Sequence, residues 1–445
     1  MADRHFLRKM VHLMMPISLQ NLMLASVAAA DAVMLGRVSQ EQMAAVSLAS
    51  QVQFVQNMVL AAAVGALTIL GAQYWGKGDT VSLKDIFNTG LRMAGAASIL
   101  TWLLCELSPG LLMRFFTNEP VLIEIGTGYL RVAGWSYLLT GISQCYLAMM
   151  KVTDHANRCA WISSGAVILN IVLNAVFIYG LLGAPAMNAE GAALATLISR
   201  IIELIWAVIS SKQKGFIEPG WSRFLKRNRV LSADFLRCAL PLLGGALLWG
   251  VGFTSYTAIL GHMGTDAAAA NSVAAVVRDL MCCLCNGMGA AGGILVGNEL
   301  GAGLLEKGRL YGDRLKKLSF FLGILCTAVI LLLTPLVLHF IILSDQAQVY
   351  LKGMMVIMAF YMIGRTVNTV IINGVFAAGG DTLFDMYSLA VTMWGIAIPL
   401  ALAGAFVFHW SVLAVYACTC LDECGKIPWV LLHFRKYKWV RNLTK

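Results

Sequence analysis

The sequence predicts an all-α protein that crosses a membrane twelve times, with its helices in two six-helix lobes related by a parallel internal repeat. Of its 445 residues, 59% are hydrophobic and only 13% are charged. A soluble protein typically has about 25% charged residues. Apolar runs long enough to cross a bilayer as helices recur along the whole chain, and the two halves of the chain resemble each other.

The apolar runs are the helices that we expect to span the membrane. They lie at 12–36, 47–73, 87–110, 126–150, 159–183, 189–211, 237–260, 271–297, 317–340, 352–377, 386–408 and 412–434. With both termini placed in the cytoplasm, the inner segments hold 24 Lys and Arg residues and the outer loops hold 3. This bias predicts a multi-pass protein of the plasma or inner membrane with both termini inside.

The net charge of +10 has the same explanation, so we expect no nucleic-acid partner. The eleven cysteines lie mostly in apolar runs, and no metal-binding pattern of cysteines occurs in a polar loop. The seven histidines form no set with a nucleophile or base. We therefore expect no cofactor and no enzyme activity. We also expect the protein to be a monomer.

The chain is expected to divide into an N-terminal lobe at 1–211, a cytoplasmic linker at 212–236 and a C-terminal lobe at 237–445. A shift of 225 residues aligns the halves without a gap over about sixty residues. It superposes Pro16 on Pro241, Gly36 on Gly261, and Gly76 on Gly301. Because each half has six spans, the repeat is parallel, and the substrate is expected in a central cavity between the lobes.

Asp31 is the residue around which the functional hypothesis is built. It is the only acid in the apolar stretch from Pro16 to Gly36. Pro16 is expected near the start of the helix and Gly36 at its end. A charge at membrane depth costs about 3 kcal/mol or more, so such an acid predicts a functional site. The alternative is that Asp31 only solvates a helix end near Gly36.

Three more polar residues are expected at the depth of Asp31. Asn170 and Asn174 are four residues apart and share a helix face, and Thr196 is in the next span. With Asp31 they can form a small oxygen-lined site for Na⁺, or hold a proton on the carboxylate. The alternative is that the amides and the hydroxyl only bond neighbouring helices.

The second half lacks this acid, since Tyr256 aligns with Asp31. Arg365 lies near the middle of the tenth span, where it either repels cationic substrates or pairs with a carbonyl or carboxylate. Tyr137, Tyr256 and Tyr361 are candidates, with Arg365, for lining a substrate cavity, although such aromatic residues more often face lipid or the core. Close pairs such as Arg200 with Glu203, and Glu423 with Lys426, are interpreted as structural.

The sequence resembles the multidrug and toxic compound extrusion (MATE) family of antiporters. The resemblance rests on Pro16, Asp31 and Gly36, and on the runs NIVLNAVFIYG, EGAALATLISR, AAANSVAAVVRDL, VGNELGAG, GGDTLF and KYKWVRNLT. It implies two lobes around a V-shaped cavity and drug efflux driven by Na⁺ or H⁺. It also implies that Asp31, Asn170, Asn174 and Thr196 form the cation site of the first lobe. Many relatives have an acid where this chain has Asn174, which weakens the expected Na⁺ site.

We therefore expect a transporter that exchanges H⁺ or Na⁺ for amphipathic, often cationic, organic compounds. Its partners are these small molecules and the lipid bilayer. The alternative is a flippase for lipid-linked oligosaccharides, which shares the two-lobe architecture and needs a more basic cavity.

Overall fold

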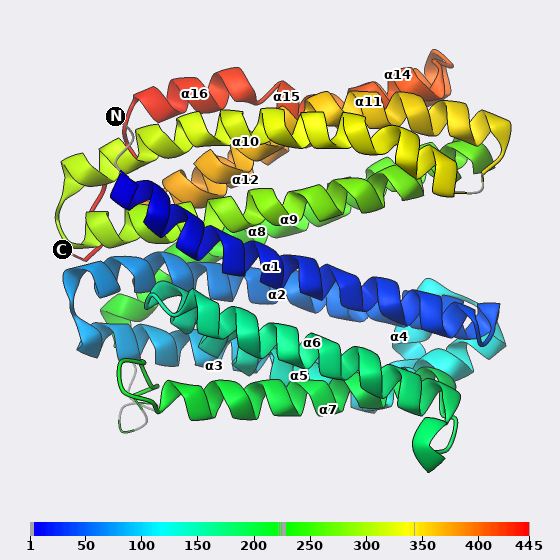
Figure 1. Ribbon diagram of the computed structural model, residues 1–445, viewed down its shortest axis with the longest axis horizontal. Helices are drawn as coiled ribbons and strands as arrows, with labels where there is room; N and C mark the ends of the chain where they lie inside the picture. Colours follow the sequence, from blue (N-terminus) through cyan, green and yellow to red (C-terminus); the bar gives the residue numbers. More distant parts are fainter. Residues whose placement is uncertain (1–3, 221, 223, 225–227, 342, 445) are drawn as a thin grey trace. The chain divides into compact units, whose positions relative to one another are not determined.

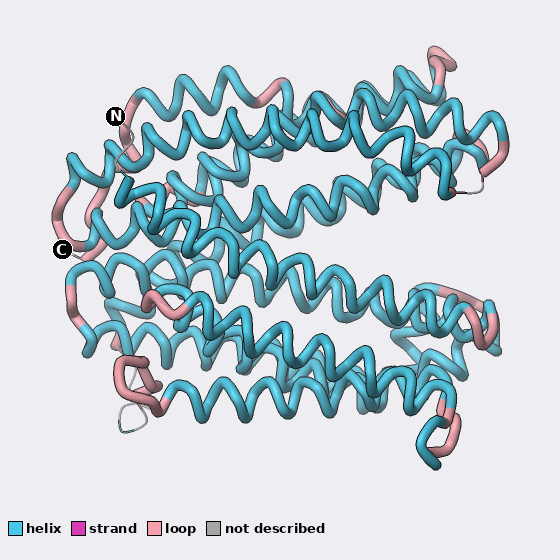
Figure 2. The backbone as a smooth tube through the Cα atoms, in the orientation of Figure 1, coloured by secondary structure: helices cyan, strands magenta, loops and turns pink. Residues whose placement is uncertain are grey.

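A computed structural model describes residues 4–220, 222, 224, 228–341 and 343–444, and these residues form helices joined by turns and short loops, without strands (Figures 1 and 2). Ten of the described helices are long and apolar enough to cross a membrane. The expected span at 126–150 lies in a further long helix, and the span expected at 412–434 is divided into three short ones. The all-α membrane fold predicted from the sequence is confirmed.

The first half of the chain contains α1 (Arg4–Gly36), α2 (Gln40–Lys77), α3 (Thr80–Leu107), α4 (Pro109–Phe116), α5 (Pro120–Val152), α6 (Ala156–Tyr179), η1 (Leu181–Gly183) and α7 (Asn188–Ser211). The second half contains α8 (Arg229–His262), α9 (Thr265–Gly301), α10 (Leu305–Phe340), α11 (Asp345–Asn368), η3 (Thr369–Phe376), α12 (Leu383–Leu389), η4 (Ala390–Ala397), α13 (Ile398–Leu402), η5 (Ala403–Val407), α14 (Val412–Thr419), α15 (Leu421–Cys424) and α16 (Ile427–Arg435). The segments η3, η4 and η5 are π-helical.

The helix that carries Asp31 begins earlier than the sequence predicted. Pro16 was expected near its start, but α1 begins at Arg4 and Pro16 lies inside it. Residues 4–15 continue the helix, which accommodates the proline although the proline removes one backbone hydrogen bond and its ring crowds the carbonyl four residues earlier. Pro241, its repeat partner, lies inside α8 in the same way. The predicted end at Gly36 is confirmed.

The chain forms two compact units. Unit 2 comprises Leu19–Gly71 and Asp79–Ala239, and unit 1 comprises Met1–Ser18, Ala72–Gly78 and Leu240–Lys445. In unit 2, α5 packs on α3 and α7, and α6 packs on α7 (Figure 1). In unit 1, α9 packs against α10, α11 and η3. The predicted linker at 212–236 falls in unit 2, and Trp221, Arg223 and 225–227 within it lie outside the described residues.

The last residues of α2 belong to unit 1 because they bind the C-terminal tail at Lys436–Thr444. Gln73 is fully buried, and its Nε2 donates to the carbonyl oxygens of Ala378 at 2.6 Å and Arg441 at 3.1 Å. Its Oε1 accepts from the Leu443 amide at 2.6 Å. Lys77 Nζ donates to the Thr444 carbonyl at 2.6 Å. A side chain from the first half of the sequence is thus fixed to the end of the chain.

Candidate functional site

In unit 2 the structure brings Asp31, Asn170, Asn174 and Thr196 together in one hydrogen-bonded cluster. Asn174 Nδ2 donates to Asp31 Oδ1, and to Asn170 Oδ1 at 3.3 Å. Asn170 Nδ2 donates to Thr196 Oγ1 at 3.1 Å. Three helices therefore contribute to a continuous chain of side chains that runs from the carboxylate to the hydroxyl.

Local helix geometry explains this convergence. The four-residue spacing on α6 places both asparagines on one face, which packs against α7. Both amide side chains are buried, whereas Asp31 and Thr196 are half-buried. Thr196 also donates to the carbonyl oxygen of Ala192 at 3.0 Å in its own helix, so its hydroxyl oxygen keeps capacity to accept.

One acceptor in this cluster has no donor among the described residues. Asn174 Oδ1 is buried and makes no hydrogen bond. A buried acceptor without a partner costs about 1–3 kcal/mol, so native structures rarely leave one unsatisfied. Beside Asn170 and Thr196 lies a small cavity of about 20 Å³. A cavity of this size holds about one water molecule or one small ion.

The sequence did not single out Tyr129, which belongs to this neighbourhood. Tyr129 of α5 is buried in the core of unit 2, close enough to Asp31 to interact with its charge. Tyr137 was predicted to line a substrate cavity. It lies instead in the same apolar core, and its carbonyl oxygen accepts from Gln56 at 2.8 Å. Both tyrosines belong to α5 and lie in this core, and nothing in the local sequence indicates that Tyr129 is the one close to Asp31.

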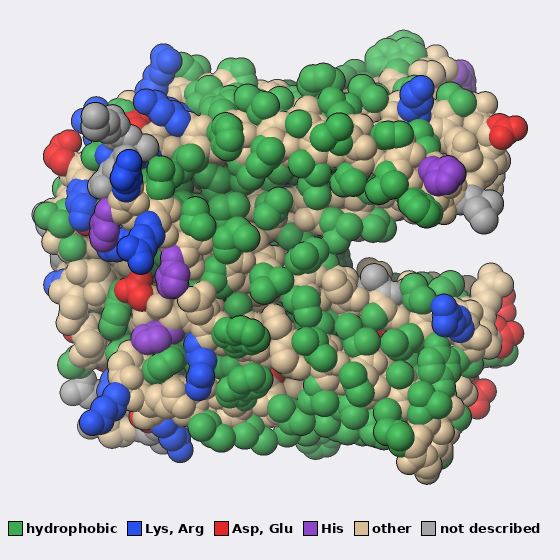
Figure 3. Space-filling model, in the orientation of Figure 1, with side chains coloured by type: hydrophobic (Ala, Val, Ile, Leu, Met, Phe, Trp, Pro, Cys, Tyr) green, Lys and Arg blue, Asp and Glu red, His purple; other side chains and the backbone are tan. Residues whose placement is uncertain are grey.

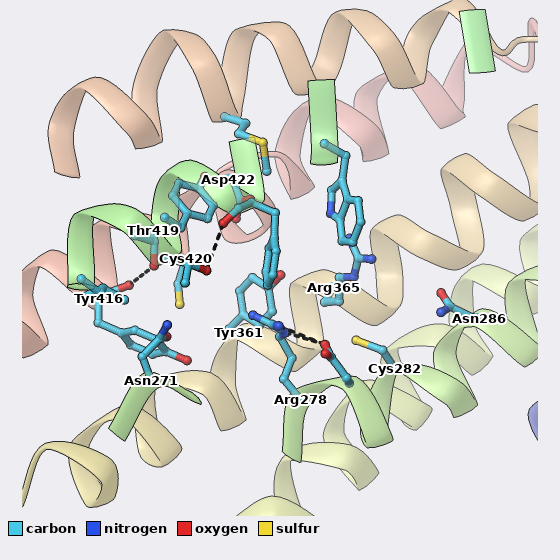
Figure 4. A pocket seen from close by; sticks show the side chains of 17 residues that line it. Asn271, Arg278, Cys282, Asn286, Tyr361, Arg365, Tyr416, Thr419, Cys420 and Asp422 are labelled. Carbon is cyan, nitrogen blue, oxygen red and sulfur yellow. Dashed lines mark hydrogen bonds and ion pairs between the residues drawn. The ribbon is translucent and has the colours of Figure 1, made fainter. Parts of the chain in front are cut away.

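Unit 1 contains a pocket of about 190 Å³ that is rich in aromatic and charged side chains (Figure 4). Its wall contains Tyr256, Tyr361 and Arg365, which were predicted to line a substrate cavity. The other aromatic side chains in its wall are those of Trp249, Phe253 and Tyr416, and the other charged side chains are those of Arg278, Asp279 and Asp422.

Both arginines of this pocket have acidic partners. Arg278 donates to Asp279 Oδ1 from Nε at 3.1 Å and from Nη2 at 2.9 Å, and its guanidinium lies 4.4 Å from the centre of the Phe253 ring. Arg365 Nη1 lies 2.7 Å from Glu423 Oε1. Arg365 therefore pairs with a carboxylate, as one of the two interpretations of its sequence position expected.

Glu423 is held from several sides. Asn368 Nδ2 donates to its Oε2 at 2.7 Å and to its carbonyl oxygen at 2.8 Å, and Lys426 Nζ is 3.8 Å from Oε2. All three side chains are buried. The short helix α15 follows a break in the last span, and this break turns Glu423 toward α11.

Asp422 is the acid of the pocket that sequence reasoning missed. It is buried, and its Oδ1 has no hydrogen-bond partner among the described residues. Tyr256 lies close enough to interact with it. Its position in an apolar run was the available signal, but the neighbouring Glu423 and Lys426 suggested only a structural pair. Asp422 is therefore an acid in the cavity wall with one carboxylate oxygen that no described residue binds.

Known proteins resemble this chain over nearly its whole length. An uncharacterized transporter, YisQ, from Bacillus subtilis is 22% identical, with 99% of this chain and 96% of the relative covered. A probable multidrug resistance protein, NorM, from Thermotoga maritima is 24% identical over 98% and 93%. The multidrug resistance protein MdtK from Yersinia enterocolitica is 25% identical over 88% and 86%.

The fold is also that of solved transporters. A crystal structure of a mutant of the Vibrio cholerae MATE transporter VcmN matches with a TM-score of 0.89, at 16% identity and 97% coverage of both chains. A MOP superfamily transporter from Pyrococcus furiosus matches with a TM-score of 0.86, at 18% identity, covering 97% of this chain and 96% of the other.

A family model gives the assignment. The MatE model matches residues 16–176 and again residues 241–403. The two matches begin at Pro16 and Pro241, which are the positions superposed by the internal repeat. Together they cover well over half of the chain. The protein is therefore a membrane transporter that belongs to the MATE family.

Proposed function

We propose that this MATE transporter is an antiporter that exchanges H⁺ or Na⁺ for amphipathic, often cationic, organic compounds. The observation that carries the proposal is the cluster of Asp31, Asn170, Asn174 and Thr196 in unit 2. An acid held by amides inside an apolar helix bundle is the kind of group that membrane proteins use for ions and protons. The similarity to NorM, a probable multidrug resistance protein, and to MdtK, a multidrug resistance protein, supports drug-like substrates.

The coupling ion would bind to Asp31. A proton would neutralise the carboxylate, whereas Na⁺ would take its oxygen ligands from Asp31, from the unpartnered Asn174 Oδ1 and from the Thr196 hydroxyl. With a single carboxylate the cluster supplies little charge for Na⁺, which favours the proton. Asp31 would take up the ion outside and release it inside, as in alternating access around a fixed site.

The pocket of unit 1 supports a cationic substrate. Asp422 supplies a carboxylate oxygen that no described residue binds, and the aromatic rings around it can hold a protonated amine through cation–π contacts. Its volume of about 190 Å³ is smaller than a pocket for a whole drug-sized molecule, which is usually about 300–1,000 Å³. We therefore assign it the charged end of the substrate.

The flippase alternative needs basic groups that are available to a pyrophosphate. Arg365 is paired with the buried Glu423 and Arg278 with the exposed Asp279, so each guanidinium already has a carboxylate partner. This observation favours the export of cations over the flipping of lipid-linked oligosaccharides.

We further propose a monomer in the cell membrane with both termini in the cytoplasm.

Reconstituted vesicles test this function. The purified protein is placed in liposomes, ethidium is the fluorescent cation, and a Na⁺ or pH gradient is imposed across the membrane. Gradient-dependent movement of ethidium, with no movement of a fluorescent lipid-linked oligosaccharide between leaflets, is the expected result. Flipping of the labelled lipid without ethidium transport would contradict the proposal.

A further inference from the structure

A second pocket, of about 400 Å³, lies in unit 1 between the start of α1 and the start of α10. Phe6 and Leu7 of α1 form one wall, and α10 forms the other with Leu310, Asp313, Arg314, Lys317 and Leu318. We propose that it binds the headgroup phosphate of an anionic phospholipid. This site is independent of the cation cluster and of the transported substrate.

Two of the side chains that line the pocket are basic, and its one acidic side chain already has partners. Asp313 Oδ1 accepts from Lys316 Nζ at 3.2 Å, and both of its carboxylate oxygens lie 3.3 Å from the Tyr437 hydroxyl. Arg314 and Lys317 are the basic residues of the lining. Two basic side chains beside an acid that already has partners can bind a phosphodiester, and an arginine has five donors in a planar fork, which suits phosphate oxygens particularly well.

Arg314 is held in place by aromatic rings. Its guanidinium lies 5.6 Å from the centre of the Phe6 ring and 6.0 Å from that of Tyr311. Phe6 and Tyr311 are buried against each other with their ring centres 4.6 Å apart. The rings therefore join α1 to α10 and at the same time position the guanidinium, so a bound phosphate would strengthen this contact between the two helices.

The depth of the pocket matches that of lipid headgroups. The first turns of α10 are polar, with the sequence LEKGRLYGDRLKK, and its apolar stretch begins at Leu318. Lys and Arg side chains gather around this start and around the first turns of α1 (Figure 3). The charge distribution predicts that these ends face the cytoplasm, where the membrane surface carries anionic lipids.

The pocket continues into apolar surface that can accept acyl chains. On α1, Val11 and Met15 follow Leu7 at helical spacing and are 54% and 57% exposed. On α10, Leu310 is 47% exposed and Phe321 is 67% exposed. A ligand that has both a phosphate and long apolar chains satisfies the basic and the apolar parts of this groove together, whereas a free phosphate satisfies only the first.

Lipid binding by the purified, delipidated full-length protein tests the proposal. Binding of phosphatidylglycerol and of phosphatidylcholine is measured by native mass spectrometry and by the shift in melting temperature. We expect phosphatidylglycerol to bind more tightly and to raise the melting temperature more. In the double variant Arg314→Gln/Lys317→Gln its affinity should fall about 30-fold, because each basic residue contributes on the order of a fivefold factor.

The control variant Lys212→Gln/Lys214→Gln removes the same charge at exposed positions in unit 2 and should bind phosphatidylglycerol as the unchanged protein does. If the double variant does not fold, Lys317→Gln alone changes an exposed side chain and should lose about fivefold in affinity. Inorganic phosphate should not displace the lipid. Unchanged affinity in the Lys317 variant, equal loss in the control, or displacement by phosphate would each overturn the proposal.

Discussion

At the scale of single residues, Asn174 distinguishes the cluster around Asp31 from one with two acids. The variant Asn174→Asp places a second carboxylate beside Asp31, and its charge should raise Na⁺ affinity about tenfold or more. Isothermal titration with NaCl measures the change. The control Asn157→Asp adds the same charge at an exposed position of α6 and should have no effect. Equal Na⁺ affinity in both variants would show that the four residues do not form the ion site.

Arg365 is the residue whose role the structure clarifies most. Its guanidinium is paired with the buried Glu423, so Arg365→Ala removes the arginine partner of a buried carboxylate. Breaking a buried pair from one side costs about 3–5 kcal/mol. We expect a lower yield of folded protein and a lower melting temperature. Arg37→Ala, at an exposed loop position, should change neither. A stable Arg365→Ala protein with an altered substrate profile would instead assign Arg365 to substrate recognition.

Local geometry was enough to predict that the four residues of the cluster lie together. Helical spacing placed Asn170 and Asn174 on one face, and the structure brings that face to Asp31 and Thr196. The partner of Arg365 could not be predicted in this way. Glu423 is 58 residues away, and it reaches Arg365 because the last span is broken between α14 and α15. A contact that depends on such a break has no local signal.

At the scale of secondary-structure elements, the C-terminal tail fixes the end of α2 to unit 1. Trp439 of the tail is fully buried and packs against Gly379, where any side chain on the glycine would overlap the Trp439 backbone. Gly301 of α9 meets the backbone of Gln73 equally closely. These glycines allow the tail, α9 and the last turn of α2 to approach one another at backbone distance.

Gln73 is the side chain that makes this attachment polar. The variant Gln73→Ala leaves the Leu443 amide and two carbonyl oxygens without their partner, which should lower the free energy of unfolding by about 2–3 kcal/mol. The melting temperature of the solubilised protein measures the loss. Gln51→Ala removes an exposed glutamine from the same helix and should be neutral. If both variants have the same melting temperature, the attachment of the tail to α2 does not depend on Gln73.

At the scale of the whole molecule, composition and repetition were sufficient to predict the fold. Apolar runs of bilayer length allow helices as the spanning elements, and the repeated prolines at 16 and 241 mark the starts of the two family matches. The limits of the helices were less predictable. Polar residues extend α1 back to Arg4, and the apolar run at 412–434 does not reveal that it forms three helices.

The orientation of the molecule follows from its basic residues and can be measured. Lys214 is in the polar segment after α7 and Lys352 is in the first part of α11, and both are exposed. In the variant Lys352→Cys, the introduced cysteine should react with an impermeant maleimide added outside intact cells. In the variant Lys214→Cys, the introduced cysteine should react only after the cells are permeabilised. Ten of the eleven native cysteines are buried, so we expect little background labelling from them. Labelling of the Lys214 variant in intact cells would reverse the assignment.

Gradient-driven efflux by Asp31→Asn is the measurement that tests the central claim. Asparagine keeps the size and the hydrogen bonding of aspartate but can neither take a proton nor offer a charge to Na⁺. The protein in vesicles should therefore fold normally and lose ethidium transport driven by either a pH or a Na⁺ gradient. Asp345→Asn, an exposed acid at the start of α11, should transport normally. Full gradient-driven efflux by Asp31→Asn would contradict the assignment of Asp31 as the coupling residue.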